Sequence, residues 1–230
     1  MTLLHHSPFC PHSRFVRLAL AEMGVEVELV EERPWERRVP FLSLNPAGTL
    51  PVLVEEAGLA VPGAGSIAAY LDETRGAAVP GRRLLPQDVA GRVEVRRLLD
   101  WFLHKFHEEV AGYLVTEKIF KRFMTADAGG GPPDGAAIRA ARSNVRYHLQ
   151  YIGYLVVRRN WLAGDELTFA DLAAAAHLSA VDYLGDVPWD ENEIAKNWYA
   201  RVKSRPTFRA LLADRVPGMA PAAHYADLDF

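Results

Sequence analysis

Cysteine is nearly absent from this sequence, in which Cys10 is the single one among 230 residues. One cysteine excludes an internal disulfide, which fits a reducing compartment. Long apolar runs are also lacking, because no stretch approaches the roughly 20 apolar residues that a membrane-spanning helix needs. The start, with Leu3-Leu4-His5-His6, lacks the basic region and apolar core of a signal peptide. We therefore predict a cytoplasmic protein that does not insert into membranes.

A surplus of charge is lacking as well. The chain carries 26 Lys and Arg residues against 29 Asp and Glu residues, and its formal net charge is −3. A nucleic-acid-binding protein needs a basic face, whereas the basic residues here are scattered, so we expect no nucleic-acid partner. Half of the residues are hydrophobic and 24% are charged, which is typical of a globular chain with one large or two small domains.

The first third of the sequence alternates strand and helix patterns. We expect strands at residues 2–6, 25–30, 50–54 and 59–61, helices at 11–23 and 65–73, and a weak helix or loop at 33–44. The short connector between the last two strands makes them antiparallel. The pattern predicts a mixed sheet with helices on its faces.

After residue 87 the patterns are helical, at 88–124, 136–160, 169–181, 191–203 and 207–213. In the first of these helices we expect an apolar stripe of Val95, Leu99, Phe102 and Phe106 that continues to Tyr113. The Gly and Pro residues between positions 74 and 87 favour a domain boundary in this segment. We predict an α/β domain at 1–75, a linker at 76–87, an all-helical domain at 88–213 and a C-terminal tail at 214–230.

The stretch Asn45–Val54 places Pro51 at the start of an apolar, β-branched run. A cis bond before Pro51 would turn the backbone of Leu50 outward and expose its N–H and C=O groups to an extended ligand. The alternative is an ordinary proline between a loop and a strand. The spacing alone favours neither.

Ser7 and Cys10 lie in the loop before the first helix. A helix N-terminus lowers the pKa of a thiol, so Cys10 is a candidate for thiolate chemistry. Cys10-Pro11-His12-Ser13 resembles a dithiol redox motif whose second cysteine is replaced by serine, which excludes disulfide cycling within the motif. The alternative is a small buried cysteine that fills a corner of the fold.

Two further helix starts carry hydroxyl side chains. Gly65-Ser66 follows two strands, so Ser66 is either an anion-binding group or a simple N-cap. Thr168 and Asp171 have the spacing of a capping box, which we interpret as structural.

Histidine pairs suggest a metal only weakly. His104 and His107 are three residues apart with Glu108 beside them, but the sequence places no third ligand. We interpret them as a surface or interface pair. His5 and His6 point to opposite faces of a strand and cannot chelate together. No metal ion is expected.

Taken together, these segments resemble the cytosolic glutathione transferases over essentially the whole chain. The similarity rests on residues 7–14, residues 45–53, Ser66-Ile67 and residues 161–172, which include the capping box. It implies a thioredoxin-like N-terminal domain, an all-helical C-terminal domain, a cis Pro51 and a homodimer. It also implies that the backbone of Leu50 and the hydroxyl of Ser66 would hold glutathione.

One position departs from the family pattern. The residue before Ser66 is usually an acid or Gln, and here it is Gly65, which offers no side chain to the γ-glutamyl amine. Losing a charge-assisted hydrogen bond of about 1.5–3 kcal/mol weakens binding by roughly one to two decades. The first strand also lacks a tyrosine that would activate a thiol.

Within the family, the sequence is most similar to alphaproteobacterial cell-division regulators that bind the tubulin homologue FtsZ. This narrower resemblance rests on Gly65, on residues 7–13 and on the ending Asp227-Leu228-Asp229-Phe230. It implies a non-enzymatic homodimer at the division site that alters the curvature or bundling of FtsZ filaments, with the ending as partner contact and no cofactor. The alternative is a glutathione transferase or glutathione-dependent thiol enzyme that uses Cys10 or Ser7.

Overall fold

The computed structural model describes residues 1–77 and 83–228. Its sheet contains the strands β1 (Leu3–His6), β2 (Glu28–Glu31), β3 (Val52–Val54) and β4 (Ala60–Pro62) in the order β2-β1-β3-β4. Strand β1 pairs parallel with β2 and antiparallel with β3, and β3 pairs antiparallel with β4. The predicted mixed sheet is confirmed, although β2 begins three residues later than the alternation of Val and Glu suggested.

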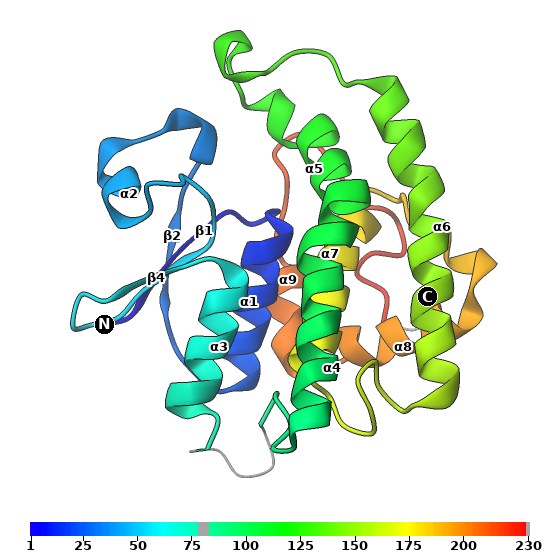
Figure 1. Cartoon of the computed structure of the whole chain (residues 1–230). Helices are drawn as coiled ribbons and strands as arrows, with labels where there is room; N and C mark the ends of the chain where they lie inside the picture. The colour runs from blue at the N-terminus through cyan, green and yellow to red at the C-terminus, as the bar shows by residue number, and fades with distance from the viewer. Residues whose placement is uncertain (78–82, 229–230) are drawn as a thin grey trace.

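Helices cover both faces of this sheet. They are α1 (Pro11–Glu22), α2 (Val39–Leu44) and α3 (Ala64–Arg75), and a 3-10 turn at Pro34–Glu36 precedes α2. Apolar side chains of α1 and α3 pack with Leu4 and Leu53 in the main core, whereas Phe41 of α2 packs with Leu50 and Val52 on the opposite face. In Figure 1, α1 and α3 accordingly lie between the sheet and the helices of the C-terminal half.

The C-terminal half is helical, as predicted. Its helices are α4 (Val89–Asp100), α5 (Gly112–Lys118), α6 (Gly135–Arg158), α7 (Phe169–Tyr183), α8 (Glu193–Lys203) and α9 (Arg209–Leu212), with a π-helical segment at Trp101–Ala111 and 3-10 turns at Phe120–Arg122, Ala126–Ala128, Trp189–Glu191 and Pro206–Phe208. The predicted linker lies between α3 and α4, and its residues 78–82 fall outside the described chain. Among the described helices, none has the length and apolarity needed to cross a membrane.

Helix α7 is the centre of the core, and all 15 of its residues are buried. Its N-terminus carries the predicted capping box, in which the Thr168 N–H donates to Asp171 at 3.0 Å and the Thr168 side chain accepts from the backbone of the first turn. Asp171 also accepts hydrogen bonds from the Leu162 N–H at 2.9 Å and from the indole N–H of Trp198 at 3.0 Å. One carboxylate therefore joins α7, the loop before it and α8.

The long first helix of this half differs from its prediction. Residues 101–111 adopt π geometry, which has more residues per turn than an α-helix and changes the phase of the apolar stripe. Leu114 is consequently buried, whereas Tyr113, which was predicted to continue the stripe, is 51% exposed.

The C-terminal tail docks on its own chain. Tyr225 is fully buried, its hydroxyl donates to the Leu211 carbonyl at 3.0 Å, and it accepts a hydrogen bond from Arg14 at 2.7 Å. Asp227 is exposed and Leu228 is half-buried. Of the predicted contact residues, Asp229 and Phe230 lie outside the described residues.

Candidate functional site

A cavity of about 590 Å³ lies where the loop after β1, the turn before β3, the start of α3 and the π-helical segment meet. Five of the predicted site residues line it, namely Ser7, Cys10, Leu50, Gly65 and Ser66. Pro51 is not part of the lining, but its peptide bond shapes the wall. Segments that are far apart in the sequence thus form one cleft.

The Leu50-Pro51 bond is cis, as the resemblance implied. The Pro51 carbonyl accepts a hydrogen bond of 2.9 Å from the Gly63 N–H at the start of α3. Within the described chain, the backbone N–H and C=O of Leu50 have no hydrogen-bond partner. Because backbone groups are normally paired, this segment before β3 can bind an extended ligand in the cleft.

The start of α3 differs in detail from its prediction. Gly63 is the N-cap, so Ser66 is the third helical residue and the simple N-cap interpretation of Ser66 is wrong. Gly65 and Ser66 are both exposed to the cavity. A Cβ atom at Gly65 would lie 3.8 Å from Leu103, an ordinary van der Waals contact, so the position tolerates a side chain sterically.

Cys10 is the N-cap of α1 and a half-buried residue. The predicted lowering of its pKa is wrong, because burial raises the pKa of the thiol. Hydrogen bonds that the Ser13 hydroxyl and the backbone N–H groups of Ser13 and His12 donate to the sulfur oppose this effect without reversing it. The structure therefore favours Cys10 as a packed thiol.

The described lining of the cleft carries few charged side chains. Among the described residues that line it, none is Lys or Arg, and Glu108 is the carboxylate. The lining therefore favours a cationic ligand over an anionic one.

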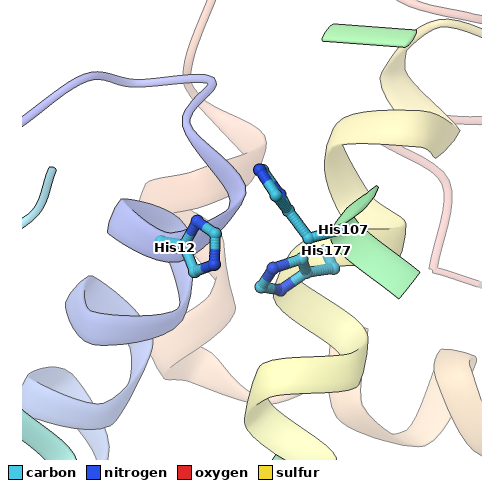
Figure 2. A group of neighbouring side chains, drawn as sticks. All are labelled: His12, His107 and His177. Atoms are coloured by element: carbon cyan, nitrogen blue, oxygen red, sulfur yellow. The ribbon is translucent and has the colours of Figure 1, made fainter. Parts of the chain in front are cut away.

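The structure separates the predicted histidine pair. His104 is 67% exposed and lies 3.7 Å from Asp100, whereas His107 turns inward. His107 meets His12 of α1 and His177 of α7, with ring centroids 4.2 Å and 5.8 Å away (Figure 2). His12 and His177 were not among the predicted site residues. They and His107 lie on three separate elements, so no spacing motif in the sequence connects them. Of the remaining predicted residues that the structure describes, Thr168, Asp171, Asp227 and Leu228 do not line this cleft.

Comparison with known proteins agrees with the fold. The glutathione S-transferase N-terminal domain matches residues 4–79, and the glutathione S-transferase C-terminal domain matches residues 136–206. The chain therefore belongs to the glutathione S-transferase family. It is 49% identical to FtsZ-localized protein A of Caulobacter vibrioides over 230 residues, which cover 99% of this chain and 97% of that protein.

Solved structures give the same assignment. A glutathione S-transferase from Sinorhizobium meliloti 1021 is 54% identical and superposes with a TM-score of 0.98 over 100% of both chains. The structure of FzlA from C. crescentus is 49% identical, with a TM-score of 0.91 over 100% of this chain and 99% of that one.

Proposed function

We propose that this protein is a non-enzymatic regulator of cell division, which binds FtsZ filaments as a homodimer at the division site and alters their curvature or bundling. The observation that carries this proposal is the 49% identity, over nearly the full length, to a protein named for its localization with FtsZ. A dimer presents two copies of one contact site, and two contacts on a polymer raise avidity and can bridge neighbouring filaments.

The chemistry of the cleft supports a non-enzymatic role. Glutathione carries two carboxylates and one ammonium group. The described lining offers no Lys or Arg to the carboxylates, and Gly65 offers no side chain to the ammonium group. Each missing charge-assisted hydrogen bond costs about 1.5–3 kcal/mol of binding free energy.

The end of the tail is our candidate contact with FtsZ. Tyr225 anchors the tail in the core, while Asp227 is exposed and Leu228 is half-buried. An acidic and apolar ending fits a groove that has basic groups at its rim. The contact surface would therefore begin immediately after a rigid anchor, which lowers the entropy lost on binding.

Co-pelleting with polymerised FtsZ tests the tail contact. We expect Asp227→Asn to lose binding while the chain stays folded, and Glu166→Gln, at another exposed acid, to bind like the wild type. Asn is preferable to a cation at position 227 because of Lys203. Burial lowers the pKa of Lys203, and the carboxylates of Asp182 and Asp227 oppose that shift, so a positive charge at position 227 would repel the Lys203 ammonium group. Binding that survives Asp227→Asn would contradict the tail contact, and a wild type that does not co-pellet would contradict the proposed function.

A glutathione-dependent enzyme is the second candidate. The unpaired Leu50 backbone beside Cys10 and Ser66 in one cavity favours it. Isothermal titration with glutathione in the co-pelleting buffer separates the two functions. Absence of heat together with co-pelleting supports the regulator, whereas micromolar binding without co-pelleting supports the enzyme.

A further inference from the structure

Three imidazole rings meet at the inner wall of the cleft. His12 comes from α1, His107 from the π-helical segment and His177 from α7, and one possible ligand atom of each ring lies within 4.8 Å of one in each of the others. Figure 2 shows the rings grouped around a common space between these elements. His12 and His107 line the cavity, while His177 is fully buried behind them.

Backbone carbonyls define the tautomers of two rings. Nε2 of His12 lies 2.8 Å from the Leu103 carbonyl, and Nδ1 of His177 lies 2.9 Å from the Ala173 carbonyl. A carbonyl oxygen only accepts, so each of these nitrogens carries the proton and the other nitrogen of the ring keeps a free lone pair. Histidines that bind metals show the same arrangement, in which a carbonyl holds the second N–H and orients the ring.

Two buried ring nitrogens need a polar partner. Nδ1 of His107 and Nε2 of His177 are buried and have no hydrogen-bond partner within the described chain. A buried polar atom without a partner costs about 1–3 kcal/mol, so such atoms usually face an ion or an ordered water. Burial also lowers the pKa of all three rings, which keeps them in the neutral form that binds metals.

The backbone around His107 is adapted to this position. The Gly112 N–H donates to the His107 carbonyl, five residues earlier, which is the bond of a π turn. A Cβ at Gly112 would come within 2.8 Å of that carbonyl and 3.0 Å of the His107 ring. Glycine therefore leaves the room that the ring occupies, and π turns occur frequently at functional sites.

We propose that His12, His107 and His177 bind one divalent transition-metal ion such as Zn²⁺ at the inner wall of the cleft. Tetrahedral coordination at about 2.0–2.1 Å per nitrogen requires the three ligand atoms to close to roughly 3.3 Å from one another. His177 is fully buried whereas His12 and His107 are half-buried, so this closure would come from the His12 and His107 rings. The fourth coordination position would face the cavity and accept a water, thiolate or carboxylate ligand.

Metal titration of the full chain without a polyhistidine tag tests the site. We expect one equivalent of Zn²⁺ to bind with micromolar or tighter affinity, and Co²⁺ to bind in its place with the visible absorption bands of a tetrahedral site. His107→Gln should weaken Zn²⁺ binding at least 10-fold. His104→Gln is the matched control, because this exposed histidine lies one turn away, and it should bind like the wild type.

The outcomes are distinct. His12→Gln keeps a donor for the Leu103 carbonyl, so it serves as a second ligand variant if His107→Gln does not fold. Saturable 1:1 binding that both ligand variants lose supports the site. Absence of saturable binding up to millimolar Zn²⁺ means that the orphaned nitrogens face an ordered water only, and it overturns the proposal. Equal binding by His107→Gln and His104→Gln would overturn it too.

Discussion

The guanidinium of Arg14 donates a hydrogen bond of 2.9 Å to the carboxylate of Asp214, and so connects the first helix to the start of the C-terminal tail. Arg14 is fully buried and uses all of its donors, the others bonding to Ser179, Tyr225 and the carbonyls of Pro8 and Leu211. A buried charge is tolerated when every donor is satisfied. This single side chain therefore holds α1, α7 and the tail together.

We predict that Arg14→Leu lowers the free energy of unfolding by about 3–5 kcal/mol. The buried oxygens of Ser179, Leu211 and Tyr225 lose their donor, at about 1–3 kcal/mol each, whereas Asp214 keeps its ion pair with Arg17 at 2.8 Å. Arg33→Leu is the control, since Arg33 forms an exposed pair with Glu36 at 3.4 Å, and its loss should cost about 0–1 kcal/mol. Urea denaturation measures both. Similar losses for the two variants would show that the Arg14 network contributes little to stability.

We expect Asp171→Ala to destabilise the chain more than Thr168→Ser. The alanine variant leaves the buried donors of Leu162, Thr168 and Trp198 without their acceptor, at about 1–3 kcal/mol each. The serine variant keeps the capping hydroxyl and should lose about 1 kcal/mol or less. Chemical denaturation with the wild type as reference measures this order, and a reversed order would contradict the structural role of Asp171.

Local features of the sequence predicted much of the fold. The capping box lies within four consecutive residues, so it follows from neighbours in the chain. The cis Pro51 was implied by the family resemblance, because the spacing alone favoured neither bond geometry. Long-range features were not predictable in this way. Arg14 and Asp214 are 200 residues apart, and no local pattern shows that they touch.

The wrong prediction that the apolar stripe continues to Tyr113 has a different cause. A constant helical period places Tyr113 on the buried face, but the π-helical segment changes the rotation per residue, so Leu114 is buried instead. The same segment turns His107 toward His12 and His177. The feature that the periodicity missed is therefore also the one that assembles the histidine cluster.

We predict that Gly65→Glu raises the affinity for glutathione by about 10- to 100-fold, because it adds one charge-assisted hydrogen bond of about 1.5–3 kcal/mol. Position 65 lines the cavity, and among the described residues a Cβ here would meet Leu103 at an ordinary 3.8 Å, so its first atom causes no clash. Gly65→Ala is the control, because it also replaces the glycine in the helix but adds no carboxylate. Isothermal titration measures the affinities, and equal values for the Glu and Ala variants would show that Gly65 is not what limits glutathione binding.

His148 makes stability depend on pH. Its Nδ1 accepts a hydrogen bond from the Trp101 indole N–H at 3.1 Å, and its Nε2 donates to Glu109 at 3.0 Å, so a second proton on Nδ1 would face a donor. Burial lowers the pKa of His148 to about 4, against the opposing effect of Glu109, while Lys105 lowers it further. The unfolded chain therefore binds one more proton than the native chain between the unfolded pKa of about 6.5 and this value.

The contribution of neutral His148 to the free energy of unfolding is thus fully present above the unfolded pKa, and it is lost as pH falls from about 6.5 toward 4. We predict that His148→Gln, whose amide can both accept from Trp101 and donate to Glu109, reduces the slope of unfolding free energy against pH in this window by up to about 1.4 kcal/mol per pH unit. Urea denaturation at several pH values measures the slope, with His104→Gln as the control at an exposed histidine. Parallel curves for His148→Gln and the wild type would show that the native chain protonates His148 as readily as the unfolded chain does.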